Sequence, residues 1–310
     1  MSEKYRIAVL GIGGVGGFYG GKLAEHFAGS SDVEIVFIAR GESAKVIKEN
    51  GLKIITAEGE RIVKPNLVSD EPSEIGKIDL FILCTKAYDL AESVEKYRDC
   101  IGENAAILPL LNGVDHAETI KQILPKADVW NGCCFIVARL IEKGIVKIDS
   151  EIRLLQFGNS GSENAKLEAT ENLFKSAGIA VELSNDIDKT IWEKFIFISS
   201  LATLTSYLDK NVGEIVKSPE HRKILLNLIA EVTNLAKAKK INIAENIEEI
   251  TLEKIKKAPP SATSSMHADF AKKGKTELET LTGYVVREAK EVSLPVPTYE
   301  RLYEELRKRN

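Results

Sequence analysis

The sequence predicts an α/β protein, in which a Rossmann-type, mostly parallel sheet forms an N-terminal domain and an all-helical C-terminal domain follows. Two observations lead to this prediction. In the first half, short apolar segments alternate with helical patterns, which is typical of a parallel sheet covered by helices on both faces. After about residue 185, almost every segment has the apolar spacing of a helix. We therefore place the domains at residues 1–185 and 186–310.

The strands and helices expected in the first half follow from its apolar runs and turn residues. A glycine cluster separates the first strand from the first helix, and Gly51 closes the second helix because glycine often ends helices. The expected elements are a strand over 6–12, a helix to about residue 28, a strand over 33–40, a helix over 42–51, a hairpin over 52–68 that turns at 58–60, strands over 78–86 and 105–113, and a strand pair over 129–148.

The second half is expected to be helical throughout. Asn185 or Asp186 is a suitable N-cap for its first helix. The expected helices are 186–208, 219–239, 245–256, 262–270 and 274–292, separated by "KSPEH", "KKIN" and "KAPPS". The apolar stripes of 219–239 and 274–292 suit either a homodimer or an internal core, and both readings stay open.

Composition narrows the class of protein. A formal net charge of -4 argues against a nucleic-acid partner, because phosphate binding requires a basic surface. The cysteines form no CxxC pair and show no zinc-like spacing with the histidines, so we expect reduced thiols and no metal. No stretch resembles a signal peptide or reaches a membrane-spanning length. We therefore expect a cytoplasmic protein without membrane contact.

The glycine-rich loop "GIGGVG" is the strongest motif for a cofactor. It has the pattern Gly11-x-Gly13-x-x-Gly16, follows an expected strand and opens an expected helix. In a dinucleotide-binding fold such glycines permit a sharp turn, close approach of a pyrophosphate and tight packing of helix on strand. A purely structural turn is the alternative. We expect a dinucleotide to contact the whole loop, which consists of Gly11, Ile12, Gly13, Gly14, Val15 and Gly16.

Arg40 at the end of the second strand indicates which dinucleotide binds. An NAD site usually places an acidic residue here for the ribose hydroxyls, whereas the next acidic residue of this chain, Glu42, lies beyond a glycine. A guanidinium suits a 2′-phosphate because it offers two parallel donors to an anion. An ordinary surface arginine is the alternative. We expect NADP(H) as the cofactor.

Two further strand ends point to the same site, and one lysine elsewhere in the chain is a separate candidate. Lys86 follows the third strand and Asn112-Gly113 follows the fourth, at strand ends where ligands of open α/β sheets bind, although both could be ordinary loop residues. Lys194 lies in "TIWEKFIFISS" among apolar helix neighbours, so its ammonium must be paired, functional or extended to water along a packed stem.

An ordered set of motifs resembles the ketopantoate reductase (2-dehydropantoate 2-reductase) family. Besides the glycine loop and Arg40, the set contains "TKA" at 85–87, "NG" at 112–113, "WEK" at 192–194, "SSM" at 264–266 and "TEL" at 276–278. It covers nearly the whole chain. The resemblance implies NADPH-dependent reduction of a 2-oxo acid to a 2-hydroxy acid, nominally 2-dehydropantoate to pantoate in pantothenate biosynthesis.

The resemblance also implies roles for individual residues. Lys194 would be the general acid that touches the substrate, and Glu277 a second catalytic residue that assists cofactor and substrate. Asp269, one turn after Ser265, is a weaker candidate for orienting the substrate site or binding Lys194. The remaining implied roles are binding of the substrate carboxylate by Ser265, contact with nicotinamide and substrate by Asn112, lining of the cofactor by Ala138, and binding of cofactor phosphate by Arg40 and Lys86.

Four departures from the family pattern concern the substrate. The family typically has asparagines, which bind the pantoate hydroxyls and carboxylate, at the positions of Ile198, Ala202, Val212 and Ala262. Their loss predicts either a less hydroxylated oxo acid or a pocket rebuilt from Ser199, Thr203 and Asn211. A non-catalytic NADPH-binding regulator is a third reading.

Overall fold

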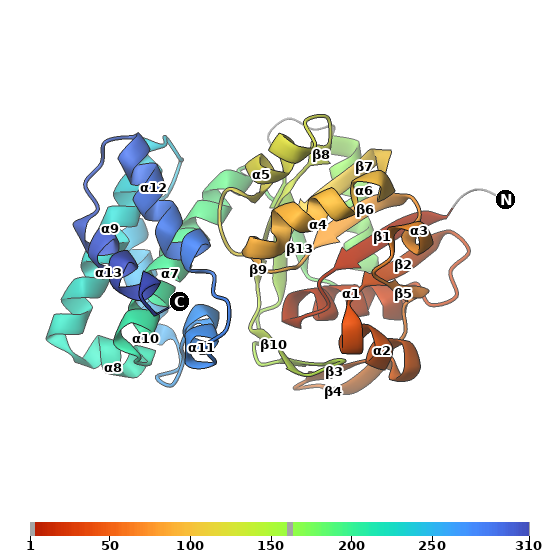
Figure 1. Ribbon diagram of the computed structural model, residues 1–310, viewed down its shortest axis with the longest axis horizontal. Coiled ribbons are helices and arrows are strands. Elements are labelled where there is room, and N and C mark those ends of the chain that lie inside the picture. The colour runs from red at the N-terminus through yellow and green to blue at the C-terminus, as the bar shows by residue number, and fades with distance from the viewer. Residues whose placement is uncertain (1–3, 160–163, 310) are drawn as a thin grey trace. The chain divides into compact units, whose positions relative to one another are not determined.

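The computed structural model describes residues 4–159 and 164–309. The chain forms two compact units (Figure 1). The first contains Met1–Leu111 and Asp115–Ile187, and the second contains Asn112–Val114 and Asp188–Asn310. We propose that each unit is a domain. No helix in the described ranges combines the length and apolar character that crossing a lipid bilayer requires.

The main sheet of the first unit confirms the predicted fold class. Its strand order is β5-β2-β1-β6-β7-β8, and all neighbouring strands are parallel. The order reverses between β1 and β6, which is where such sheets bind ligands. The strands are β1 (Tyr5–Leu10), β2 (Val33–Ile38), β5 (Leu67–Ser69), β6 (Ile78–Leu83), β7 (Ile101–Pro109) and β8 (Asp128–Val129).

Helices connect these strands and bury the apolar side chains of the sheet. They are α1 (Gly14–His26), α2 (Gly41–Asn50), α3 (Pro72–Ile75), α4 (Leu90–Lys96) and α5 (His116–Ile123), with short 3₁₀ turns at Ala87–Asp89 and Arg98–Cys100. The central strands are buried on both faces, since Ile7, Ala8 and Val9 of β1 are each 0% exposed. Such strands lack alternation, which explains why apolar runs alone identified them.

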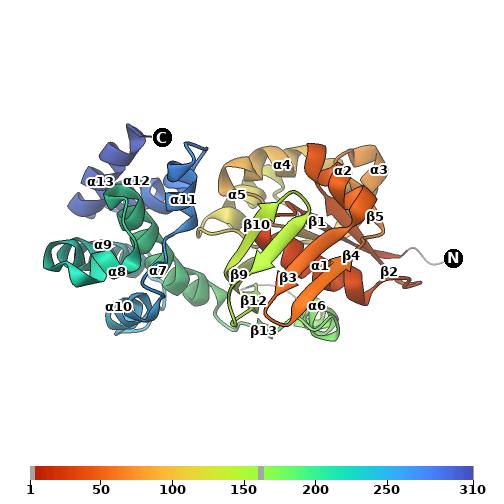
Figure 2. The ribbon, with the colours of Figure 1, turned by 90° about the horizontal axis from the view of Figure 1, so that it is seen from below.

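Two smaller sheets complete the first unit. One has the order β10-β11-β3-β4, and Figure 2 shows its strands together with α1, which contacts β10, β11 and β3. The other has the order β13-β12-β9. The strands are β3 (Leu52–Thr56), β4 (Gly59–Val63), β9 (Asn131–Phe135), β10 (Ala138–Glu142), β11 (Ile145–Ile148), β12 (Leu154–Gly158) and β13 (Val181–Leu183), and α6 (Asn164–Ser176) lies between the last two in sequence.

The expected strand pair over 129–148 is wrong in its pairing. Only β10 and β11 pair with each other, whereas β8 joins the main sheet and β9 pairs with β12. The expected hairpin ends at Val63, and Leu67–Ser69 instead forms β5 of the main sheet. Apolar runs reveal strands, but the partner of a strand depends on contacts distant in sequence.

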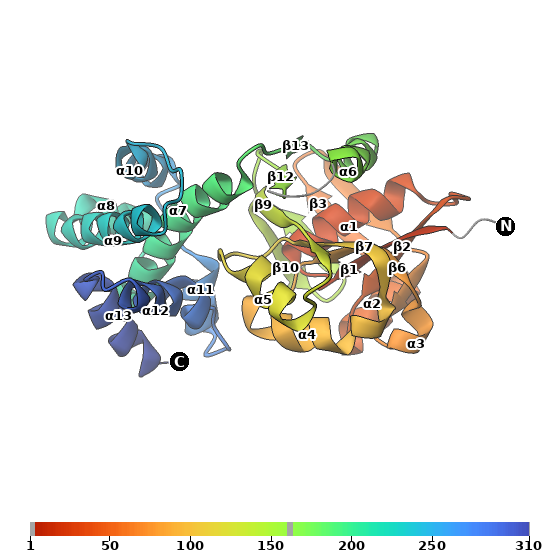
Figure 3. The same cartoon turned by 90° about the horizontal axis from the view of Figure 1, so that it is seen from above.

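The second unit is helical, as predicted. Its long helix α9 (Pro219–Ala238) contacts α8, α10, α12 and α13 (Figure 3). The other helices are α7 (Ile187–Leu208), α8 (Val212–Lys217), α10 (Ile247–Lys257), α11 (Ser265–Ala271), α12 (Tyr284–Glu291) and α13 (Pro297–Arg307). The aromatic rings of Trp192, Phe195 and Tyr284 pack together in its core.

Two expected helices of this unit have different bounds. The helix expected over 262–270 begins at Ser265, because the Ser264 hydroxyl accepts the His267 amide and caps it there. The helix expected over 274–292 is a π-helical segment, Glu279–Gly283, followed by α12. We call Glu279–Gly283 the π turn.

Candidate functional site

The glycine-rich loop folds tightly at the carboxyl end of β1. Gly11 has φ +89°, a conformation that side chains rarely adopt, and a Cβ there would lie 2.7 Å from the Cys84 carbonyl oxygen. A Cβ on Gly14 would lie 2.4 Å from the carbonyl oxygen of Ala138, and one on Gly16 would lie 2.2 Å from that of Gly11. Packing within the protein therefore accounts for Gly11, Gly14 and Gly16, and it places Ala138 beside the start of α1.

Gly13 differs from these glycines. It is the N-cap of α1 with an extended backbone, and its carbonyl accepts the Gly17 amide at 2.8 Å. A Cβ at Gly13 would have no described atom within 4 Å. The protein itself therefore does not require glycine here, whereas a phosphate approaching the start of the helix would.

Thr85 supplies a polar group next to this loop. It follows β6, and its backbone nitrogen would lie 2.9 Å from a Cβ on Gly11. Its Oγ1 is buried and has no hydrogen-bond partner among the described residues. Buried hydroxyls are normally paired, so this atom fits a site that a ligand completes. Thr85 is the first residue of the "TKA" motif, and its place at a strand end was the signal that could have predicted a role for it.

Arg40 and Lys86 follow the two strands that flank β1. Arg40 is the N-cap residue of α2, and Lys86 precedes the 3₁₀ turn at Ala87–Asp89. A guanidinium nitrogen of Arg40 lies 3.8 Å from Asp89 Oδ2, so the two loops meet. The Arg40 side chain is 66% exposed, and ion pairs of such exposed groups contribute about 0–1 kcal/mol. Arg40 can therefore turn to an anion at little cost.

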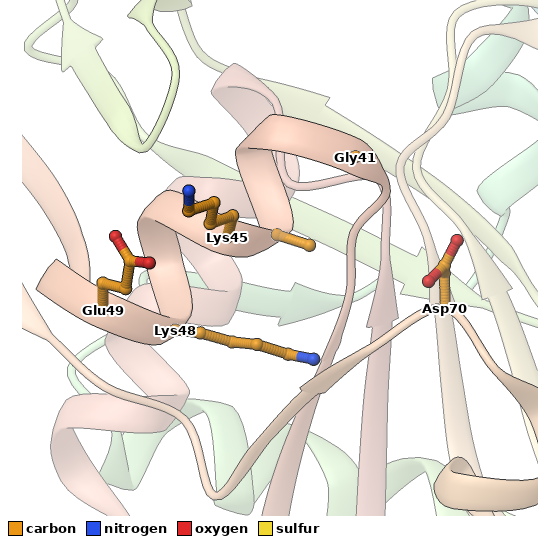
Figure 4. A pocket seen from close by; sticks show the side chains of 6 residues that line it. Gly41, Lys45, Lys48, Glu49 and Asp70 are labelled. Atoms are coloured by element: carbon orange, nitrogen blue, oxygen red, sulfur yellow. The ribbon is translucent and has the colours of Figure 1, made fainter.

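A pocket of about 520 Å³ lies beside α2 (Figure 4). Its lining residues are Gly41, Ala44, Lys45, Lys48, Glu49 and Asp70. Its charged side chains are of both signs, and no predicted site residue lines it. We therefore do not assign it to the predicted site.

In the second unit, Lys194 and Asn112 are brought together. Lys194 lies on α7 and is half-buried, and its Nζ donates a hydrogen bond of 3.0 Å to Asn112 Oδ1. Asn112 arrives from the loop after β7, where Asn112–Val114 belongs to the helical unit and Val114 packs against its core. Two residues chosen separately from the sequence thus form one polar pair.

The other predicted residues of this unit differ in burial. Glu277 is only 4% exposed and lies two residues before the π turn. Ser265 is exposed as the first residue of α11, and Asp269 is half-buried on the same helix. The burial of Glu277 is unusual for a carboxylate, which suits a functional group better than the solvated helix face that its charged neighbours suggest. The roles of all three residues stay predictions.

The positions where the family has asparagine are apolar and packed. Ala202 is 0% exposed and Val212 is 2% exposed, both within the helical core, while Ile198 and Ala262 are half-buried against it. The Val212 amide donates to the Ala262 carbonyl at 2.9 Å, so these two positions are neighbours.

The hydroxyl and amide groups proposed to rebuild the pocket are engaged elsewhere. Ser199 Oγ donates to the carbonyl oxygen of Leu281 at 2.6 Å, and Thr203 shares a hydrogen bond of 2.7 Å with Thr282. Asn211 caps α8 by accepting the Glu214 amide at 3.0 Å. Each of these side chains already has a partner within the helical unit, and its use in a rebuilt pocket stays a prediction.

Among the described residues, no three histidine, cysteine, aspartate or glutamate side chains cluster as metal ligands would. Within the part of the chain that the structure describes, Cys84, Cys100, Cys133 and Cys134 form no disulfide.

Comparisons with known proteins agree with these features. Residues 7–161 match the family model described as ketopantoate reductase PanE/ApbA, and residues 186–310 match its C-terminal counterpart. The uncharacterized oxidoreductase YkpB of Bacillus subtilis is 30% identical over 97% of both chains. The 2-dehydropantoate 2-reductase of Halobacterium salinarum is 26% identical over 96% of both chains.

A solved structure extends the likeness to the fold. The crystal structure of 2-dehydropantoate 2-reductase from Porphyromonas gingivalis W83 is 36% identical, covers 98% of this chain and 99% of its own, and has a TM-score of 0.85. The resemblance predicted from the ordered motifs is confirmed. The chain belongs to the ketopantoate reductase family and is an oxidoreductase that acts on CH–OH groups with a nicotinamide cofactor.

Proposed function

We propose that this protein uses NADPH to reduce a 2-oxo acid to the corresponding 2-hydroxy acid. The observation that carries the proposal is the hydrogen bond from Lys194 Nζ to Asn112 Oδ1, which holds a half-buried ammonium at a fixed point. A 2-oxo acid reductase needs such a cation, because the carbonyl oxygen gains negative charge as it is reduced. A non-catalytic NADPH-binding regulator would have no need of it.

The residues present fit a bound dinucleotide. The glycine loop leaves the backbone open at Gly13, and the start of α1 offers amide donors to a pyrophosphate. Thr85 Oγ1, which has no described hydrogen-bond partner, and the backbone of Ala138 lie beside the same loop. When bound, the nicotinamide cofactor supplies the hydride.

NADPH is favoured over NADH by Arg40, which lies two residues after the end of β2. Arg40 presents a mostly exposed guanidinium, and its neighbour Gly41 has φ +57° and would place a Cβ more than 4 Å from any other described atom. The pairing with Asp89 at 3.8 Å is long, so a 2′-phosphate would compete well for the guanidinium. Lys86 lies at the start of the same 3₁₀ turn as Asp89 and would add a second cation.

Lys194 would act as the general acid. Its ammonium can stabilise the charge that develops on the carbonyl oxygen and then donate a proton to that oxygen. Asn112 Oδ1 accepts one ammonium hydrogen and so limits the directions in which the other two point. We also propose that Glu277 assists from its buried position and that Ser265 binds the substrate carboxylate, as the family resemblance implies. Asp269, one turn after Ser265, would orient the substrate site or bind Lys194.

For the substrate, the structure favours an oxo acid with fewer hydroxyl groups than ketopantoate. Ala202 and Val212 lie in the hydrophobic core and offer no polar atom beyond the backbone. Ser199 and Thr203, which could have compensated, bond to the π turn. A site without hydrogen-bonding partners for substrate hydroxyls gains no selectivity for a hydroxylated substrate. Ketopantoate stays the nominal substrate of the family, and an apolar 2-oxo acid is the candidate that this chain favours.

A cytoplasmic location and a homodimer are also part of the proposal. The four cysteines form no disulfide within the described residues, which suits a reducing compartment. Sedimentation of the purified protein over a range of concentrations would test the dimer, and a monomer throughout would remove it.

The test is a panel of 2-oxo acids with purified protein and NADPH, followed at the nicotinamide absorbance. We expect turnover of acids with apolar side chains to exceed that of ketopantoate in kcat/KM. Faster turnover of ketopantoate would restore the family substrate. Bound NADPH without turnover of any acid would instead favour the regulator.

Two substitutions make the test specific. Lys194→Met should lower kcat by about 100-fold or more, because general acid catalysis is typically worth 10²–10⁴-fold. Lys256→Met, which removes an exposed lysine paired with Glu253 at 2.8 Å, is the matched control. An active Lys194→Met enzyme would refute the proposed acid.

Substrate preference has its own pair of variants. Ile198→Asn should raise kcat/KM for ketopantoate relative to an apolar acid, since it restores an amide at a half-buried family position. Ile224→Asn changes another half-buried isoleucine of the helical core and should leave this ratio unchanged.

A further inference from the structure

The π turn begins two residues after Glu277, and a serine on α7 holds it. π-Helical segments interrupt the regular hydrogen bonding of a helix and often occur at functional sites. We propose that Ser199, itself held by Tyr299, is a positioning residue that fixes the π turn, and with it Glu277, against the helix that carries Lys194. This inference rests on the proposed function, in which Lys194 and Glu277 are catalytic.

The hydrogen bonds of Ser199 have only one consistent direction. Ser199 is 0% exposed, and its Oγ lies 2.6 Å from the carbonyl oxygen of Leu281 and 2.7 Å from the hydroxyl of Tyr299. A carbonyl can only accept, so the single hydroxyl hydrogen of Ser199 goes to Leu281. Tyr299 must then donate to Ser199. The hydrogen bonds therefore run in one direction, from the Tyr299 hydroxyl to Ser199 and from Ser199 to the backbone of the π turn.

Leu281 connects these hydrogen bonds to Glu277. The Leu281 amide donates to the backbone carbonyl of Glu277 at 3.0 Å, while its own carbonyl accepts from Ser199. A second contact supports the first, since Thr203, one turn after Ser199, shares a hydrogen bond of 2.7 Å with Thr282. Adjacent residues of the π turn are thus tied to one face of α7.

Tyr299, the donor to Ser199, is itself held in place. The backbone amides of Thr298 and Tyr299, at the start of α13, each donate 2.9 Å hydrogen bonds to the carboxylate of Glu231 on α9. Tyr299 is 0% exposed, and burial raises the pKa of its hydroxyl, which therefore stays a donor at neutral pH. Elements distant in sequence converge on Ser199, and nothing else in the proposed chemistry explains why a buried serine is placed there.

Ser199→Ala and Ser206→Ala are a matched pair for the test. Both serines are buried on α7, but Ser206 Oγ has no hydrogen-bond partner in residues 4–159 and 164–309. Ser199→Ala should lower kcat about 10- to 100-fold, the loss expected when a catalytic group is displaced. Ser206→Ala should leave kcat unchanged. Tyr299→Phe, which keeps the Ser199–Leu281 bond, should lower kcat by a smaller factor.

Hydrogen exchange supplies a readout that does not depend on turnover. The Leu281 amide should exchange faster in Ser199→Ala than in wild type or Ser206→Ala, because its segment is released from α7. Unchanged exchange would overturn the proposal whether or not the enzyme is active. Faster exchange with an unchanged kcat would overturn it as well, because the turn would then have no effect on catalysis.

The wild-type measurement separates the two levels of inference. A wild type that reduces none of the acids would refute the proposed function, and the positioning role would fall with it. An active wild type with a fully active Ser199→Ala variant would refute only the positioning role.

Discussion

Replacing Gly13 with alanine separates cofactor binding from folding, because Gly13 is the loop glycine that the protein itself does not require. A Cβ at Gly13 would have no described atom within 4 Å, and its backbone is extended with φ −93°. Gly14→Ala is the opposite case, since its Cβ would lie 2.4 Å from the carbonyl oxygen of Ala138 and 2.8 Å from the amide nitrogen of Arg139.

The expected stability changes follow from these surroundings. At an N-cap, alanine is worse than glycine by about 0.5–1 kcal/mol, but losing glycine removes a similar amount of unfolded-state entropy, about 0.4–1 kcal/mol. Gly13→Ala should therefore change the free energy of unfolding by less than about 1 kcal/mol. Gly14→Ala forces backbone apart and should cost about 1–3 kcal/mol.

Gly13→Ala should change NADPH affinity strongly although it changes stability little. A hydrogen bond to a charged group contributes about 1.5–3 kcal/mol, so a methyl that holds a phosphate away should weaken NADPH binding roughly 10- to 100-fold. Urea unfolding without cofactor and calorimetric titration with NADPH measure the two quantities. Wild-type affinity in Gly13→Ala would refute phosphate approach at this residue, and equal destabilisation by both variants would refute the difference in packing.

Three further predictions concern other parts of the chain. Arg40→Ala should weaken NADPH binding at least tenfold and barely change NADH binding. The control is Arg61→Ala, at a comparably exposed arginine of β4, which should change the binding of neither cofactor. Equal losses of affinity for both cofactors in Arg40→Ala would exclude phosphate recognition by Arg40. Burial raises the pKa of Tyr97 from 10.0 to about 12, so the stability contributed by its neutral hydroxyl is complete below pH 10 and is lost as the pH rises toward 12. The urea midpoint of the wild type should therefore fall across this range, and Tyr97→Phe should reduce that fall. An unchanged slope would contradict this prediction. Asn211→Ala removes the cap of α8 and should cost about 1 kcal/mol of unfolding free energy without changing KM, whereas a raised KM would return Asn211 to the substrate pocket.

Much of the fold was predictable from local sequence. The central strands of the main sheet are mainly apolar, and the glycine loop has its strand before it and its helix after it. Pairing was not predictable, because β9 finds its partner β12 about twenty residues later and β5 is only three residues long. The π turn was missed because a period of 3.6 residues continues smoothly through it.

Individual residues of the candidate site could be predicted from the sequence, but the hydrogen bonds that join them could not. Lys194 was conspicuous as a charge among apolar neighbours, and Asn112 as an amide at a strand end, yet only the structure joins them at 3.0 Å. Ser199 and Thr203 are recognisable from the sequence as polar residues of a helix, but their bonds to Leu281 and Thr282 are visible only in the structure. A hydroxyl on a buried helix face can bond to a substrate or to a neighbouring backbone, and sequence does not distinguish these.

The assignment of Asn112–Val114 to the helical unit has a consequence for dissecting this protein. The chain enters that unit briefly after β7, returns to the first unit, and enters again at Asp188, so no single cut separates the two. A fragment that begins at residue 188 would carry Lys194 but not Asn112, and the complementary fragment would carry the amide but not the ammonium. Genetic splitting at the obvious boundary would therefore divide the proposed acid from the group that aims it. A fragment pair that regains activity on mixing would have to restore this loop insertion as well as the cofactor site.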